Sequence, residues 1–391
     1  MQTTNKTTIW VWTIASFFAF FVFGFSDNLK GATIPAFLRD LNFSYSVGGS
    51  VLLGIYIGFL IATLLTGILA DLAGKKTVLI IAAVCLALGI LGFSSFSTFW
   101  PLALSMLVLG LGLGAIELGA NNMIVDLHSA QKAKYLNLMS VLHGLGSMTA
   151  PLYAGSLLAN EFSWRQVYQG ALALVAVMLV YTLLAKYPRE IVQKSESISF
   201  SKLIKTAFSG YTIWYYFLIA IYVSTELGIG SWIVEFLQTQ KGLDVSLSTQ
   251  MLSLYFGLMM VGRFIGSFFV DRIGYLRIML MVSLAAFVSI AVGVFGPPEL
   301  FFLLPVSGLF LSIIFPTITA AVSDQHVANQ GAILGLLFTF AGLGGMLGPW
   351  LVGVASDLLG LQIGFSATLL FCALMIGMLL ILLAGQKRAA V

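Results

Sequence analysis

Two short stretches of the sequence decide how the chain is organised. The first, GILADLAGKKTVL, covers residues 67 to 79, and the second, GSFFVDRIGYLRIM, covers residues 266 to 279. Asp71 and Gly74 match Asp271 and Gly274 at an offset of 200 residues, and cationic residues follow in both stretches. A repeated segment of this kind indicates that the chain consists of two related halves.

The composition around these stretches is that of a polytopic membrane protein. Of the 391 residues, 59% are hydrophobic and 9% are charged. A water-soluble fold of this length needs a far more charged surface, whereas lipid makes such a surface unnecessary. The net charge of +4 is spread along the chain, so we expect no nucleic-acid partner. Cys85 and Cys372 lie in separate apolar runs without metal-ligand spacing, and we expect neither a metal nor a cofactor.

Twelve apolar segments are long enough to cross ~30 Å of hydrocarbon as helices. They cover residues 9 to 38, 47 to 70, 77 to 97, 100 to 127, 135 to 159, 166 to 186, 211 to 239, 247 to 270, 277 to 296, 299 to 323, 331 to 356 and 362 to 385. The longest polar break falls after the sixth segment. The prediction is an all-α integral membrane protein with twelve transmembrane helices in two pseudo-symmetric bundles: an N-terminal six-helix bundle at 1–186, a cytoplasmic linker at 187–210 and a C-terminal six-helix bundle at 211–391.

The cationic residues predict the orientation of these helices. With both termini and the long break in the cytoplasm, fourteen cationic residues lie inside: Lys6, Lys75, Lys76, Lys132, Lys134, Lys186, Arg189, Lys194, Lys202, Lys205, Arg272, Arg277, Lys387 and Arg388. Arg39, Arg165 and Lys241 then lie outside. This asymmetry favours cytoplasmic N- and C-termini. The first apolar segment lacks a cleavage site, so it is expected to stay as a helix.

Ionisable residues within the predicted spans are candidate functional residues, because a charge in hydrocarbon is costly unless it is paired, neutralised or hydrated. They are Asp27, Lys30, Glu117, Glu226 and Arg263. Arg263 lies near the cytoplasmic end of its segment, where we expect it to pair with Asp271 or to bind carbonyl groups.

The fourth segment carries the clearest polar pattern, GLGLGAIELGANNMIVDL, at residues 110 to 127. Gly110 and Gly114 share a helix face with Glu117, and Asn121 follows one turn later. This face has the composition of a polar cavity wall. The alternative is a glycine stripe for helix packing, in which Glu117 bonds to a neighbouring helix.

The first segment contains GFSDNLKGATIP, residues 24 to 35, with Asp27 and Lys30 on either side of Asn28. If Lys30 pairs with Asp27, the carboxyl stays charged, and Glu117 is the better proton carrier. Lys30 either neutralises Asp27 or binds an anionic solute. Asn28 and Asn121 are candidate substrate ligands.

Three further polar residues lie within predicted helices. His143, in SVLHGLGS at 140 to 147, is either a packing residue or a cavity ligand. Tyr222 and Glu226 are one turn apart in YVSTELGIGSWIVEFL, residues 222 to 237, and are candidate substrate ligands.

The loop pattern GxxADxxGKK at residues 67 to 76 resembles the signature of the major facilitator superfamily, and the resemblance covers essentially the whole chain. It implies that the loop charges are gating residues, namely Asp71, Lys75, Lys76, Asp271 and Arg272. The alternative is a pair of solvated turns whose cations only set the orientation.

Within that superfamily, GLGAIELGANN and YLNLMSVLHGLGS resemble segments of the fucose, galactose and glucose:proton symporter family. SIIFPTITA at 312 to 320 and GRFIGS at 262 to 267 are similar to it as well. The resemblance implies that Glu117 is a proton-coupling or substrate-binding carboxyl and that His143 takes a cavity position held by asparagine in fucose members. The chain departs from the family at Gly31, where an aspartate is expected; Asp27 lies one turn earlier.

The function predicted is a proton-coupled symporter of a sugar or a related small polar solute, working by alternating access as a monomer in the cell membrane. Glu117 and Asp27 are the expected proton-coupling residues. Two alternatives stay open: a proton-coupled efflux antiporter for amphipathic compounds, and a non-transporting sensor with a transporter fold. No nucleophile with an adjacent base stands out, so we do not expect an enzyme.

Overall fold

The computed structural model describes residues 6–185, 212–325 and 330–389, and within them the chain is almost entirely helical. The fold class predicted from the sequence, an all-α membrane protein, is confirmed. The predicted linker at 187–210 lies outside the described residues, and the boundary between the halves stays a prediction.

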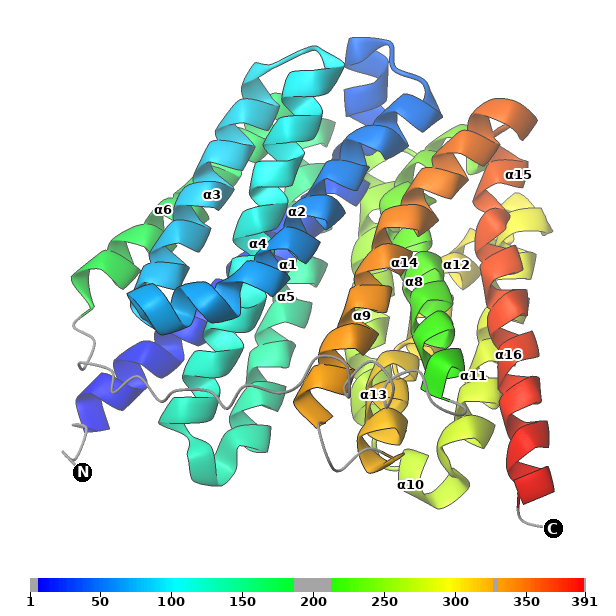
Figure 1. Cartoon of the computed structure of the whole chain (residues 1–391). Coiled ribbons are helices and arrows are strands. Elements are labelled where there is room, and N and C mark those ends of the chain that lie inside the picture. Colours follow the sequence, from blue (N-terminus) through cyan, green and yellow to red (C-terminus); the bar gives the residue numbers. More distant parts are fainter. Residues whose placement is uncertain (1–5, 186–211, 326–329, 390–391) are drawn as a thin grey trace. The chain divides into compact units, whose positions relative to one another are not determined.

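The N-terminal half contains long helices joined by short connections (Figure 1). They are α1 (Lys6–Leu41), α2 (Tyr45–Ala73), α3 (Lys75–Ser95), α4 (Phe99–Leu127), α5 (Lys132–Ala159) and α6 (Trp164–Leu184), with a short 3-10 turn η1 (Ser129–Gln131) before α5. Each matches one predicted segment, and α1 extends beyond both of its predicted ends.

The C-terminal half follows the same order but its helices are interrupted. They are α8 (Thr212–Lys241), α9 (Val245–Gly266), α10 (Val270–Ile273), α11 (Tyr275–Phe295), η2 (Pro298–Phe302), α12 (Leu303–Leu311), α13 (Ile314–Gln325), α14 (Gln330–Leu359), α15 (Leu361–Phe365) and α16 (Ala367–Ala389). The tenth predicted segment is therefore broken between α12 and α13, and the twelfth between α15 and α16.

Eleven of the described helical segments are long and apolar enough to cross a membrane. Helix α5 is long enough but is not among them. It carries His143 and several hydroxyl residues, which make it more polar than its neighbours. The fifth predicted segment is thus a helix whose polar residues reduce its apolar character.

The glycines of the two repeated stretches have the same unusual backbone conformation. Gly74 has φ 83° and ψ 154°, and Gly274 has φ 88° and ψ 144°. Residues with a Cβ atom are almost excluded from this region. Each glycine lies directly before a helix, α3 or α11, and allows the chain to reverse there. The repeat in the sequence is therefore a repeat in backbone geometry.

Contacts divide the chain into two compact units. Among the described residues, the first unit contains 6–43, 50–185 and 245–253, and the second contains 44–49, 212–244 and 254–389. Each unit includes the first turns of one helix, α2 or α9, whose remainder belongs to the other unit.

The two units use the same pattern of helix packing. In the first, α1 packs on α5, α3 packs on α4, and α3 packs on α6. In the second, α8 packs on α14, α11 packs on α12, and α11 packs on α16. Glycines bring the main pairs close: a Cβ atom on Gly146 of α5 would lie 2.2 Å from the Phe21 carbonyl oxygen, and one on Gly344 of α14 would lie 2.0 Å from that of Ala220.

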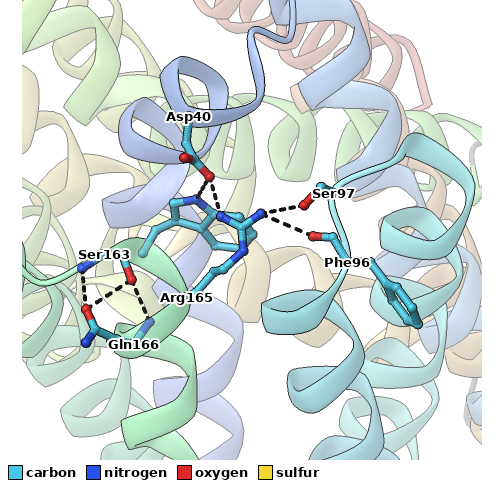
Figure 2. Close-up of polar contacts among 7 residues, drawn as sticks. Asp40, Phe96, Ser97, Ser163, Arg165 and Gln166 are labelled. Carbon is cyan, nitrogen blue, oxygen red and sulfur yellow. Dashed lines mark hydrogen bonds and ion pairs between the residues drawn. The ribbon is translucent and has the colours of Figure 1, made fainter.

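A polar cluster joins α1, α3 and α6 at one end of the first unit (Figure 2). Arg165 forms an ion pair with Asp40, and its other nitrogen donates to Ser97 Oγ at 2.9 Å. The Trp164 indole nitrogen donates to the same Asp40 carboxylate at 3.0 Å. Three helices are therefore tied at residues that precede or follow their apolar segments.

Helix α6 begins in a capping box that directs two of these side chains. The Gln166 amide nitrogen donates to Ser163 Oγ, and the Ser163 amide nitrogen donates to Gln166 Oε1 at 2.8 Å (Figure 2). Both backbone amides, which lack an acceptor within the helix, are thus hydrogen-bonded, and the first turn of α6 is fixed. Trp164 and Arg165, which follow Ser163, are thereby held toward Asp40.

The loop geometry gives a first prediction. Gly74→Ala should destabilise the protein by about 1–3 kcal/mol, because alanine is strained at this φ and ψ. Gly377→Ala is the matched control, since Gly377 lies in α16 with no atom within 4 Å of an added Cβ. Thermal unfolding of the detergent-purified protein should show a lower midpoint for Gly74→Ala and no decrease for Gly377→Ala. Equal midpoints would contradict the strain argument.

Candidate functional site

In the first unit, Asp27 and Lys30 form an ion pair, which the sequence left open. Lys30 Nζ also donates to the Asp27 carbonyl oxygen at 2.7 Å. The ammonium lies 5.5 Å from the centre of the Tyr56 ring, within cation–π range. The three-residue spacing places both side chains on one face of α1.

Lys30 is only 5% exposed, whereas Asp27 is partly exposed. Within the described residues, the ammonium donates to the Asp27 carboxylate and to the Asp27 carbonyl oxygen. These contacts favour the alternative in which Lys30 neutralises Asp27. A contact between Lys30 and substrate stays a prediction.

On α4, the Asn121 amide donates to Glu117 Oε1 at 3.2 Å. Gly110 and Gly114 pack on α2, because their added Cβ atoms would lie 1.9 Å and 2.6 Å from the carbonyl oxygens of Ile55 and Phe59. The glycine stripe therefore serves helix packing, as one alternative held. The glutamate differs from that alternative: in the described part of the chain its hydrogen bond is to its own helix.

Asn28 joins α1 to α5. Its amide donates to Ser147 Oγ and to the Gly24 carbonyl oxygen, both at 2.9 Å, and the residue is 6% exposed. A Cβ atom on Gly24 would lie 2.1 Å from the His143 carbonyl oxygen, so the two helices touch here. Asn28 is therefore a packing residue in this structure, and its role as a substrate ligand stays a prediction.

The His143 ring lies among aromatic side chains of α1. Its centroid is 4.7 Å from that of Phe23 and 6.4 Å from that of Phe20, in edge-to-face arrangements. The residue is partly exposed. His143 therefore packs against α1, and its exposed part leaves the alternative of a cavity ligand open.

In the second unit, polar groups from α8 and α9 meet. The Tyr255 hydroxyl donates to the Glu226 carbonyl oxygen at 3.3 Å. The fully buried Tyr222 lies within electrostatic reach of Glu226 and Arg263. Arg263 Nε donates to the Ser312 carbonyl oxygen at 3.2 Å, at the break between α12 and α13, so Arg263 binds a carbonyl as one expectation held.

Five of the predicted polar residues share one property: each lies well inside a long helix and is nevertheless partly exposed. They are Asp27, Glu117, Asn121, His143 and Glu226. A carboxyl in contact with hydrocarbon would cost several kcal/mol, whereas a hydrated one would not. The exposed faces of these residues are therefore suited to water or to a polar solute.

The predicted gating residues lie at the loops between helices. Lys75 forms an ion pair with Asp126 at the end of α4, and Lys76 Nζ donates to the carbonyl oxygens of Leu183 and Ala185 at 3.0 and 2.7 Å. Both contacts lie within the first unit. Asp71, Asp271 and Arg272 are exposed, and their gating role stays a prediction.

The sequence did not identify two neighbours of the site. They are Asp126, the partner of Lys75, and Tyr255, and the sequence singles out neither. Each contact joins two consecutive helices, between residues 51 and 29 positions apart respectively, and no local pattern encodes it.

Comparison with known proteins identifies the family model that matches this chain. The Major Facilitator Superfamily model matches residues 16–304. A glucose/galactose transporter of Brucella abortus is 25% identical over 369 residues, which are 88% of this chain and 88% of that protein. The quinolone resistance protein NorA of Staphylococcus aureus is 24% identical over 387 residues, 95% of this chain and 96% of NorA.

Solved structures share the fold. The nucleoside transporter NupG superposes with a TM-score of 0.80 at 18% identity, covering 95% of this chain and 99% of NupG. The transporter FucP, in its outward conformation, has a TM-score of 0.64 at 18% identity, covering 95% of this chain and 98% of FucP. Identities this low show the fold alone.

The Asp27–Lys30 pair gives a second prediction. Lys30→Met should be strongly destabilising, by about 3–5 kcal/mol, because it leaves a carboxylate without its cation. The double variant Asp27→Asn with Lys30→Met should recover most of that loss. Thermal unfolding midpoints of the two single variants and the double variant measure the coupling. If the loss of stability in the double variant equalled the sum of the losses in the two single variants, the two side chains would not be coupled. That result would contradict a stabilising ion pair within α1.

Proposed function

We propose that this chain, which belongs to the Major Facilitator Superfamily, carries a sugar or a related small polar solute across the membrane together with protons. Proteins of this family are transporters and not enzymes. The chain is accordingly a multi-pass integral membrane transporter, as its helices indicate. The solute and the coupling ion are the proposed parts.

The observation that carries the proposal is the Glu117–Asn121 pair in the middle of α4. A partly exposed carboxyl with an amide one turn away can bind a hydroxyl group from both sides, as donor and as acceptor. The similarity to glucose/galactose transporters supports a sugar as the solute.

Glu117 is the proposed proton carrier. Its described hydrogen bond is with a neutral amide, so no cation holds it in the charged form. Asp27 differs because it forms an ion pair with Lys30. Protonation of Glu117 can favour the conformation of the transporter that also binds the solute. This preference couples proton transport to solute transport.

The loop cations fit the same proposal. We assign both termini to the cytoplasm of a cell membrane, since the sequence gathers Lys and Arg on that side. Lys75 and Lys76 then lie at the cytoplasmic start of α3, in contact with the ends of α4 and α6, where they would control access from the cytoplasm.

A second candidate function is efflux of amphipathic compounds in exchange for protons. It is favoured by the similarity to the quinolone resistance protein NorA and by the 31 phenylalanines of the chain. The two functions differ in direction and in the polarity of the solute, so one vesicle system can separate them.

The proposal is tested with purified protein in proteoliposomes. Radiolabelled D-glucose or D-galactose should accumulate when the outside is acidified, and the accumulation should vanish when a protonophore removes the gradient. Norfloxacin provides the comparison. Gradient-driven movement of norfloxacin without movement of either sugar would replace symport by efflux.

Glu117→Gln tests the proton carrier. The variant should lose gradient-driven sugar accumulation, because a glutamine amide cannot take up and release a proton at this position. Exchange of labelled for unlabelled sugar at equal pH should continue, because it needs no net proton movement. Asp27→Asn is the control at the other carboxyl. Unchanged accumulation in Glu117→Gln would remove Glu117 from the proton path.

A further inference from the structure

His128 links the start of α1 to the connection between α4 and α5. It follows the last residue of α4 and directly precedes the 3-10 turn η1. Its Nε2 atom lies 2.7 Å from Oγ1 of Thr13, a fully buried residue of α1. The contact joins two segments 115 residues apart in sequence, and both belong to the first unit.

The Thr13 hydroxyl determines which ring nitrogen of His128 carries a hydrogen. Thr13 Oγ1 donates its single hydrogen to the Ile9 carbonyl oxygen at 2.8 Å. The hydroxyl can then only accept from His128, so Nε2 is the donor. In the neutral ring Nδ1 carries no hydrogen, and a further proton would bind there. Within the described residues the ring makes no hydrogen bond through Nδ1, so a proton on this atom would need water as its acceptor.

Aromatic rings surround this imidazole. The Tyr135 ring of α5 stacks on it, with centroids 3.5 Å apart and an interplanar angle of 12°. The half-exposed Trp10 of α1 meets both rings edge to face, with centroids 6.2 Å from each. Such contacts between rings are favourable. They also keep water away from His128, which makes its neutral form the one suited to this position.

The ionisable side chains near this end of the neighbouring elements are mostly cationic. They are Lys6 on α1, Asp126 on α4, and Lys132, Lys134 and Tyr135 on α5, and η1 contributes none. The one carboxylate of this set, Asp126, is ion-paired with Lys75. Burial lowers the pKa of His128 below its ordinary value of 6.5. The ring is therefore neutral at neutral pH, and protonation disfavours its present place.

We propose that His128 is an acid sensor on the cytoplasmic side, and that a proton on Nδ1 releases the start of α1 from the α4–α5 connection. The inference rests on the proposed function and its orientation. Helices α1, α4 and α5 pack on one another and carry Asp27, Glu117 and His143, respectively. Looser packing at their shared end would slow transport when the cytoplasm becomes acidic. Because a symporter brings protons into the cytoplasm, the sensor would limit its own uptake.

Nuclear magnetic resonance of 13C-labelled histidine tests the sensor without any solute. The His128 signal, identified by its absence in His128→Gln, should titrate with a midpoint below 6.5 in the purified protein. In Thr13→Val the ring should move into water, and the midpoint should rise towards 6.5. A midpoint at or above 6.5 in the wild-type protein would overturn the proposal.

Thr182→Val is the matched control for the titration. Thr182 is also buried and donates to a carbonyl oxygen of its own helix, that of Met178, at 2.7 Å. It has no contact with His128, so its replacement should leave the His128 midpoint unchanged. An equal rise of the midpoint in Thr13→Val and Thr182→Val would also overturn the proposal.

Quenching of Trp10 fluorescence measures the release itself and needs no change at Thr13. The Trp10 signal is the difference between the wild-type protein and Trp10→Phe. Its quenching by acrylamide should increase from about pH 7.5 to about pH 5.5, on either side of the ordinary histidine pKa. The same difference, measured in the His128→Gln background, should not change, because the glutamine amide can donate to Thr13 but takes up no proton. An equal increase in both backgrounds would contradict the sensor.

Sugar exchange at equal pH on both sides separates regulation from a structural role. His128→Gln and the wild-type protein should exchange labelled D-galactose at the same rate near pH 7.5, and the wild type should be the slower of the two near pH 5.5. A rate lowered equally at both pH values in His128→Gln would mean a structural role and overturn the proposal. If the wild-type protein carries no galactose, the proposed function fails at this step, and the histidine titration and Trp10 quenching still decide whether the sensor exists.

Discussion

The cost of placing a charge in hydrocarbon governs this structure more than any other term. Several kcal/mol separate a bare carboxylate in lipid from one that is paired or hydrated. The chain meets this constraint in two ways. Lys30 neutralises Asp27 within one turn of α1, whereas Glu117 and Glu226 remain partly exposed in the middle of α4 and α8.

The packing within each unit follows from the same cost of polar groups in hydrocarbon. Long helices satisfy their own backbone, and glycines at Gly146 and Gly344 bring the main helix pairs into backbone contact. Ion pairs at helix ends, Asp40 with Arg165 and Lys75 with Asp126, add to these contacts, and Asn28 adds a hydrogen bond inside α1 and α5. The start of α2 is the exception, because the helix is continuous while its contacts change from one unit to the other.

Periodicity and repetition in the sequence predicted the helical class, the spans and the equivalence of Gly74 and Gly274, since these depend on local composition and backbone strain. The Asp27–Lys30 pair was also predictable, because its members are three residues apart. The break at residue 366 was not, since it interrupts an apolar run without a proline or a charge. The break at residues 312–313 lies one turn before Pro316, whose missing amide hydrogen leaves the Ser312 carbonyl available to Arg263. The partners of Lys75, His128 and Asn28 depend on tertiary packing, which a single sequence does not display.

Proton movement coupled to solute movement is the central claim, and a pH-sensitive dye inside proteoliposomes measures it most directly. With no pH gradient imposed, addition of D-glucose or D-galactose outside should acidify the interior, and the signal should be absent in liposomes without protein. Sugar entry measured in the same vesicles without any acidification would contradict proton coupling through Glu117.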